Sequence, residues 1–96
     1  MARRIYRVIE APEVERRLRV VPAELIDLWL TVVHQVLTLD PVTEGGPHQI
    51  TYIRDAAAYR LQAEAASGGR VYVYYEALED ERVVLIVDFE WWPARR

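Results

Sequence analysis

The stretch from residue 23 to residue 39, AELIDLWLTVVHQVLTL, constrains the fold more than any other part of this 96-residue chain. Its polar residues recur every three or four positions, which places them on one narrow stripe of a helix. They are Glu24, Asp27, Thr31, His34 and Thr38. The rest of the circumference is mostly apolar, and such a helix must be covered on more than one side. We therefore expect a helix packed on a sheet, with a second helix as further cover. Any apolar surface that remains would be a partner surface or an exposed patch.

The rest of the chain carries strand patterns. Residues 5–11, IYRVIEA, alternate and are rich in β-branched and aromatic side chains, which is typical of a strand. Three more strands are predicted over residues 59–64, 70–77 and 82–92. Residues 50–53, ITYI, are either a short strand or a structured loop. These segments supply the sheet that the helix requires.

Prolines mark where the helices begin and end. Pro12 stops the first strand and suits the first turn of a helix, where its missing N–H costs nothing. Apolar residues at helical spacing then predict a short helix over residues 12–21. Pro22 separates this helix from the long one. Asp40-Pro41 closes the long helix, because the residue before a proline avoids the α region.

The elements follow the order β-α-α-β-β-β, with one further strand if residues 50–53 pair. Three C-terminal strands joined by short connections should form an antiparallel meander. We expect the first strand to join the edge of this twisted, antiparallel sheet, with both N-terminal helices packed on one face. The predicted fold is α+β, as a single domain over residues 1–96.

Composition limits the classes of function. The chain has no cysteine, which excludes disulfides and cysteine-ligated zinc and fits the cytoplasm. We expect no secretory signal and no contact with a membrane, because no apolar stretch approaches the ~18–20 residues that cross a bilayer. The net charge of −3 argues against a strongly nucleic-acid-seeking surface. All 12 basic residues are arginines, which indicates either a composition bias or phosphate recognition by planar guanidinium groups.

Four segments, in this order, resemble the RelE/ParE superfamily of small bacterial toxins. They are YRVIEAPEVERRLRVVP, LTLDP, YRL and VYYEALEDERVVLIV, and they cover most of residues 5–88. The resemblance implies a RelE/ParE-like fold and the toxin of a toxin–antitoxin pair, neutralised by a cognate antitoxin that wraps its surface. RelE-like members cleave mRNA at the ribosome, whereas ParE-like members inhibit DNA gyrase without nuclease chemistry.

Metal-free RNA cleavage needs a base for the 2′-hydroxyl, cations for the phosphorane and an acid for the leaving oxygen. The resemblance carries the family's basic position on the second strand onto Arg60, while Gln62 stands where another cation is usual. Tyr72 stands where a phosphate-binding arginine is expected. Arg70 lies two residues earlier on the same strand face and is its predicted substitute. Arg60 and Arg70 either contact phosphate in this way or form surface salt bridges.

Further site candidates lie around these strands. Glu64 shares a strand face with Arg60 and is a candidate general base, and His48 is a candidate catalytic residue in a Gly-Gly-Pro loop. His34 is expected to face solvent or a partner. No metal or cofactor is expected, because neither histidine belongs to a metal-binding motif. The tail offers only Arg95 and Arg96 for RNA binding, without the tyrosine that often follows in the family.

Two adjacent tryptophans, Trp91 and Trp92, end the last strand. Neighbouring residues on a strand point to opposite faces, so one tryptophan closes the core and the other is exposed or covered. Exposed tryptophan is enriched at binding hot spots. The pair is therefore a candidate site for contact with an antitoxin or with a second copy of the chain, as a homodimer, and the alternative is that Trp92 packs under the N-terminal segment.

The leading hypothesis is a RelE-like mRNA endonuclease that acts at the ribosome by metal-free 2′-hydroxyl attack. The alternative is a non-catalytic protein of the same fold, either a ParE-like gyrase inhibitor or an inactive relative that acts through protein association. Gln62, Tyr72 and the short tail favour the alternative, because they reduce the set of basic residues.

Overall fold

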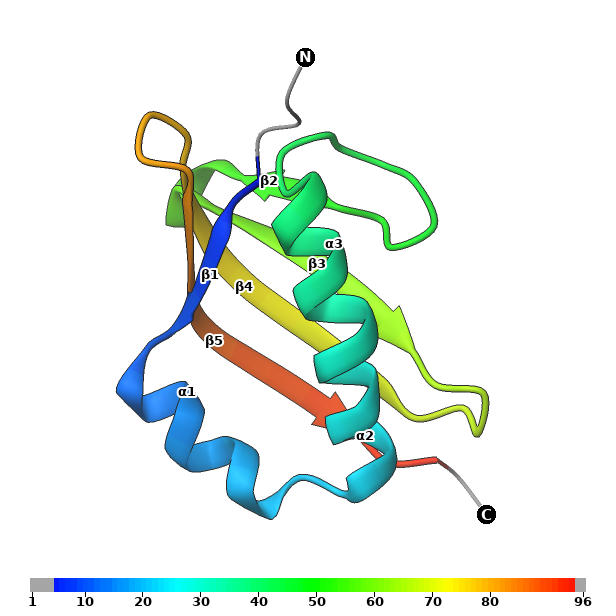
Figure 1. Ribbon diagram of the computed structural model, residues 1–96. Coiled ribbons are helices and arrows are strands. Elements are labelled where there is room, and N and C mark those ends of the chain that lie inside the picture. Colours follow the sequence, from blue (N-terminus) through cyan, green and yellow to red (C-terminus); the bar gives the residue numbers. More distant parts are fainter. Residues whose placement is uncertain (1–4, 95–96) are drawn as a thin grey trace.

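The computed structural model describes residues 5–94 and has an α+β fold, which confirms the predicted class (Figure 1). The helices are α1 (Pro12–Arg17), continued by a 3-10 turn (Leu18–Val20), then α2 (Ala23–Leu28), a wider π-helical turn (Trp29–Val33) and α3 (His34–Leu39). The strands are β1 (Arg7–Glu10), β2 (Thr51–Ile53), β3 (Ala58–Glu64), β4 (Arg70–Leu78) and β5 (Val83–Trp92).

The five strands form one open, twisted sheet in the order β1-β5-β4-β3-β2 (Figure 1). The pairs from β2 to β5 are antiparallel, as predicted for the meander, and residues 51–53 extend it as β2. β1 runs parallel to β5, so the sheet is mixed and the prediction of a wholly antiparallel sheet was wrong. A strand separated from its neighbour by several elements can join an edge in either direction, and local sequence does not specify which.

Residues 23–39 form one long helix across a single face of the sheet, made of α2, the π-helical turn and α3 (Figure 1). It ends at Asp40, whose φ of −158° leaves the helical region immediately before the proline. α1 packs on β5 on the same side of the sheet. The further cover expected around the long helix is incomplete, because Leu30 on its outer side is 61% exposed.

The core lies between this helical layer and the sheet. Alternate residues of β3, β4 and β5 point into it, as the period of a strand requires. The largest fully buried side chains include Tyr75, Phe89, Leu25, Leu37, Leu61 and Ile86. The opposite face of the sheet carries no α-helix within residues 5–94 (Figure 1). A short 3-10 turn, Arg54–Ala56, connects β2 to β3. In the same part of the chain, no helix is long and apolar enough to cross a membrane.

Candidate functional site

The face of the sheet opposite the helices gathers most of the polar and aromatic strand residues. Strand pairing arranges them in three rows across β3, β4 and β5. The rows are Glu64–Arg70–Trp92, Gln62–Tyr72–Glu90 and Arg60–Tyr74–Asp88. Sequence alternation predicted that Arg60, Gln62 and Glu64 share one face, and the strand register agrees. This open face carries the candidate site.

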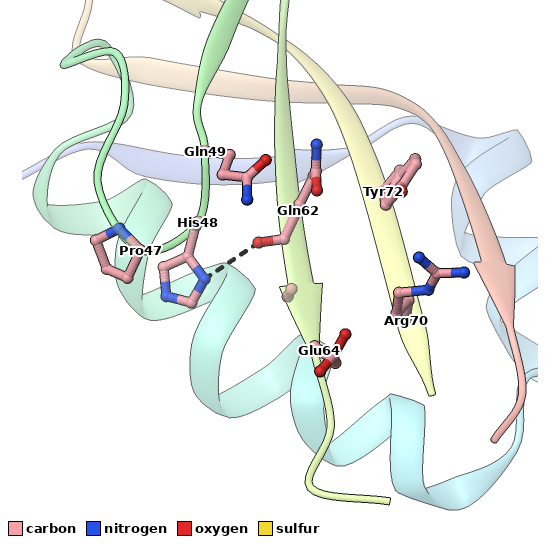
Figure 2. A pocket seen from close by; sticks show the side chains of 8 residues that line it. Pro47, His48, Gln49, Gln62, Glu64, Arg70 and Tyr72 are labelled. Carbon is pink, nitrogen blue, oxygen red and sulfur yellow. Dashed lines mark hydrogen bonds between the residues drawn. The ribbon is translucent and has the colours of Figure 1, made fainter. Parts of the chain in front are cut away.

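A hollow of about 320 Å³ lies at one end of the open face, between β3, β4 and the loop that precedes β2 (Figure 2). It is lined by Pro47, His48, Gln49, Gln62, Ala63, Glu64, Arg70 and Tyr72. Four candidate site residues from three separate segments, His48, Glu64, Arg70 and Tyr72, therefore line one hollow. Arg60 is adjacent, with its guanidinium carbon 5.7 Å from the centre of the Tyr72 ring.

His48 is fixed to the backbone of Gln62 by two hydrogen bonds. The Gln62 N–H donates to the His48 carbonyl at 2.8 Å, and His48 Nδ1 lies 3.1 Å from the Gln62 carbonyl oxygen. A carbonyl oxygen only accepts, so Nδ1 carries the proton in this bond. In neutral imidazole the lone pair then lies on Nε2, which leaves that nitrogen free to accept a proton.

The loop that carries His48 is held at both ends. The Tyr75 hydroxyl, which is buried, donates to the Pro41 carbonyl at 2.6 Å at the start of the loop. Gly45 and Ile50 then pair through two backbone hydrogen bonds, and Gly45 and Gly46 have positive φ angles of 87° and 72°. Glycine adopts such angles without steric cost, so the loop turns sharply and returns His48 to the sheet.

Neither Arg60 nor Arg70 has an ion pair within residues 5–94. Both guanidinium groups instead lie near aromatic rings, Arg60 beside Tyr72 and Arg70 at 6.0 Å from the centre of Trp92. Arg60 Nε is buried and has no hydrogen-bond partner in the described part of the chain. An unsatisfied buried donor costs about 1–3 kcal/mol, which favours any ligand that lets the guanidinium turn onto an acceptor. The alternative prediction, that Arg60 and Arg70 form surface salt bridges, is therefore wrong for the described residues.

The far side of the open face is acidic. Arg17 from α1 reaches over it and binds Asp88 Oδ1 at 2.5 Å and the Phe89 carbonyl at 2.6 Å. The hydrogen bond from Arg17 lowers the pKa of Asp88 below its usual value. The Tyr74 hydroxyl donates to Glu90 at 2.8 Å, and this bond, together with burial, raises the pKa of Tyr74. These carboxylates would repel a phosphate, which confines any anion to the β3–β4 side.

The remaining residues predicted from the sequence lie apart from the hollow. Trp91 points to the helical side and packs against the core. Trp92 on the open face is 42% exposed, so within residues 5–94 it is not covered by the N-terminal segment, which was the alternative prediction. His34 was predicted to face solvent or a partner; its Nε2 instead lies 3.0 Å from Glu10 Oε2 on β1, and that oxygen also accepts from the Trp29 indole at 2.5 Å. Arg95 and Arg96 lie outside the described residues.

Several residues of this face were not anticipated as site residues. Gln49 and Pro47 line the hollow because the loop folds back onto β3. Tyr74 and Asp88 lie in the row of Arg60, and Arg17 reaches the face from a helix. Strand alternation places Tyr74 on the same face as Tyr72, and this was the available signal for it. The sequence contains no comparable signal for the loop and helix residues.

The arrangement offers a proton acceptor, two arginines without ion pairs among the described residues, and aromatic surface around one hollow, which suits an anionic, base-bearing ligand. Among residues 5–94, no three His, Asp or Glu side chains come together as ligands for a metal ion. Comparisons with protein-family models, with curated proteins and with solved structures found no match to this chain.

Proposed function

We propose that this protein is the toxin of a toxin–antitoxin pair, with a RelE-like fold, and that it cleaves mRNA at the ribosome by metal-free attack of the 2′-hydroxyl. The observation that carries the proposal is the hollow on the open sheet face. His48, Glu64, Arg70 and Tyr72 line it together, and Arg60 lies beside it. Arginines that have no ion pair in the described part of the chain, next to an accepting imidazole, are the groups that this chemistry requires.

The proposed step begins with proton transfer from the ribose 2′-hydroxyl to Nε2 of His48. The 2′-oxygen then forms a bond to the adjacent phosphorus, and the bond from phosphorus to the 5′-oxygen of the next nucleotide breaks. The leaving oxygen takes a proton from water or from the Tyr72 hydroxyl in the same hollow. The products are a 2′,3′-cyclic phosphate and a 5′-hydroxyl end.

The charged residues have separate roles in this step. Arg60 and Arg70 stabilise the phosphorane, on which negative charge increases during the attack. Glu64 lies directly across from Arg70 on the neighbouring strand and remains the second candidate base. His48 is favoured over Glu64, because its bond to the Gln62 carbonyl fixes the tautomer that accepts a proton at Nε2.

The proposal assigns the protein to the bacterial cytoplasm, where ribosomes and a cognate antitoxin are available. Its partners there are mRNA on the ribosome and the antitoxin. A peptide that covered the open face would exclude RNA from the hollow and neutralise the toxin. In this reading Trp91 is a core residue, and Trp92 is the tryptophan that remains accessible to a ligand, an antitoxin or a second copy in a homodimer.

A second candidate function is non-catalytic binding, either of DNA gyrase or of another protein. The observation that favours it is the acidic side of the open face, where Glu76, Asp88 and Glu90 line a separate hollow of about 630 Å³. Three carboxylates so close to the arginines weaken the attraction for RNA. They are compatible with a protein partner that carries basic side chains.

Induced expression in a bacterial host, followed by growth curves and primer extension across abundant mRNAs, tests the proposal. We expect growth arrest with new 5′ ends inside translated codons. The double variant Arg60→Ala/Arg70→Ala should lose both effects and remain folded, because Arg70 is exposed and neither arginine has an ion pair within residues 5–94 that the variant would break. Arg19→Ala is the matched control, since Arg19 is an exposed arginine outside the sheet and without an ion pair among the described residues.

Other outcomes would reject the nuclease activity, the toxin function or the location of the site. Growth arrest without new 5′ ends would reject the nuclease and favour gyrase or another protein target. Absence of arrest with a folded, abundant protein would reject the toxin function as a whole. Equal toxicity of the double variant and the wild type would show that the site lies elsewhere on the molecule.

A further inference from the structure

A second hollow, of about 520 Å³, adjoins the first one at the end of the open face. It is lined by Glu64, Ser67, Gly68, Arg70, Trp92, Pro93 and Ala94. Glu64 and Arg70 line both hollows and therefore stand between them. The two hollows therefore lie next to each other, with His48 lining the first and Trp92 lining the second.

The walls of the second hollow are fixed by local contacts. Its hairpin, residues 65–69, turns through Gly68, whose φ of 98° favours glycine. The Ser67 hydroxyl donates to Glu24 on the long helix, which ties the hairpin to the helical layer. An added Cβ at Gly69 would lie 3.0 Å from Leu25 Cδ2 and 3.4 Å from the Trp92 carbonyl oxygen, so hairpin, helix and strand end pack closely.

Trp92 presents an aromatic surface to this hollow. Its ring system meets the Tyr72 ring in an edge-to-face arrangement, with 5.1 Å between ring centres and 61° between ring planes. The Arg70 guanidinium carbon lies over the Trp92 ring, 6.0 Å from its centre. Trp92 is 42% exposed even though the adjacent Trp91 packs against the core. Core packing therefore does not account for a large apolar side chain at this position.

We infer that Trp92 is a base-stacking platform and that the second hollow holds an unpaired nucleobase of single-stranded RNA. The inference rests on the proposed function, because it assigns the nucleotide next to the one whose phosphate is attacked. Aromatic side chains beside unpaired cations are the combination that binds single strands without sequence preference. The hollow falls within the range of about 300–1,000 Å³ that is typical of small-ligand sites.

Arg70 lies between the hollow beside His48 and the hollow beside Trp92. Since it lines both hollows, its guanidinium is placed to bind the phosphate between a ribose beside His48 and a base stacked on Trp92. Arg70 has no ion pair within residues 5–94, and Glu64 across from it does not come within salt-bridge distance. A substrate that fills both hollows therefore needs at least two consecutive unpaired nucleotides.

Binding of a short 2′-O-methyl oligoribonucleotide tests the inference. This probe keeps bases and phosphates but has no 2′-hydroxyl to attack, so binding is measured without cleavage. We expect Trp92→Leu to weaken binding roughly 5- to 100-fold in fluorescence anisotropy, whereas Trp92→Phe keeps it within a few fold. The wild-type tryptophan fluorescence should be quenched on binding, and Trp92→Phe should lose most of the quench, because Trp29 is buried in the core and Trp91 is partly buried against it on the helical side.

Tyr52→Leu is the matched control, since Tyr52 is an aromatic residue of similar exposure on the edge strand β2. It should bind the probe like the wild type. Circular dichroism of each variant reports folding, and Trp92→Phe keeps the test valid if Trp92→Leu does not fold.

Several results would overturn the inference. Unchanged probe affinity in Trp92→Leu, together with mRNA cleavage by the wild type, would reject the stacking position and leave the proposed function intact. A wild-type protein that neither binds the probe nor cleaves mRNA would reject both. Loss of a protein partner in Trp92→Leu with unchanged probe affinity would show that Trp92 serves protein association instead.

Discussion

At the scale of single residues, His48 combines a structural and a chemical role. Its carbonyl and its Nδ1 both bond to the backbone of Gln62, which holds the loop against β3. The same contact directs the accepting lone pair to Nε2. A structural histidine and a catalytic histidine would be equally sensitive to alanine, so the substitution must separate the two roles.

Asparagine at position 48 separates them. His48→Asn retains a side-chain N–H that can donate to the Gln62 carbonyl, but it has no group that accepts a proton at Nε2. We expect mRNA cleavage to fall about 10²- to 10⁴-fold with an unchanged melting temperature. His48→Ala should also lose stability, by about 0.5–1.5 kcal/mol, because the hydrogen bond is lost. Quantitative primer extension and thermal unfolding measure the two effects, and full activity of His48→Asn would transfer the role of base to Glu64.

The Arg17–Asp88 pair makes a second prediction, concerning pH. The hydrogen bond from Arg17 lowers the folded-state pKa of Asp88, so its stabilisation is complete above the unfolded pKa of about 3.9 and is lost as pH falls through the folded value. Both side chains are substantially exposed, at 41% and 56%, which limits the effect to about 0.5–1 kcal/mol. Urea unfolding should show that Asp88→Asn is less stable than the wild type at pH 7 and equal to it near pH 2.

Asp80→Asn is the control for this measurement, because Asp80 is an exposed turn residue without an ion pair among residues 5–94. It should match the wild type at both pH values. A difference between wild type and Asp88→Asn that persisted at the lower pH would contradict the pKa argument.

At the scale of elements, the long helix has apolar residues both on the side that packs against the sheet and on its outer side. Leu25 is fully buried against the sheet and the 65–69 hairpin, whereas Leu30 on the outer side is 61% exposed. The apolar composition of residues 23–39 identified a helix packed on a sheet. It did not identify which leucine would remain outside, because both belong to the same apolar region of the helical surface.

Substituting these two leucines in turn tests the helix orientation. Leu25→Ala should reduce the free energy of unfolding by about 2–5 kcal/mol, since it leaves a cavity between the long helix and the sheet. Leu30→Ala should change it by no more than about 0.5 kcal/mol, because little buried area is lost. Urea unfolding measures both, and a large loss at Leu30 would indicate that a second copy of the chain covers this side.

At the scale of the whole molecule, charge is divided across the open face. Arg60 and Arg70 lie on β3 and β4, while Asp88 and Glu90 lie on β5. The chain as a whole carries −3. An acidic protein with one local pair of unpaired arginines should bind RNA through few phosphate contacts, unlike a protein with an extended basic surface.

The salt dependence of RNA binding measures how many contacts form. Two phosphate contacts to a single strand predict a slope of about −1.4 for the logarithm of the binding constant against that of the salt concentration. Arg70→Ala should reduce the slope by about 0.7, whereas Arg19→Ala should leave it unchanged. Anisotropy titrations between low and moderate salt provide the slope, and a value steeper than about −3 would require basic residues outside the hollow.

The sequence by itself determined the features that depend on neighbours along the chain. Proline positions and hydrophobic periods located α1, the long helix and the strands, because these signals act within a few residues. Strand alternation placed Arg60 with Glu64 and predicted that Trp91 and Trp92 point to opposite faces. These predictions did not require knowledge of any partner strand.

Only the tertiary structure decided how distant segments meet. Three features join residues far apart in the chain: the parallel direction of β1, the bonds between His48 and Gln62, and the contact of His34 with Glu10. A fourth, the exposure of Trp92 and not of Trp91, depends on which face of the sheet is covered. Such contacts depend on strand register and on the path of loops, and no periodic pattern in a local segment specifies either. The candidate site was therefore predictable as a set of residue types on one strand face, and its two hollows were not.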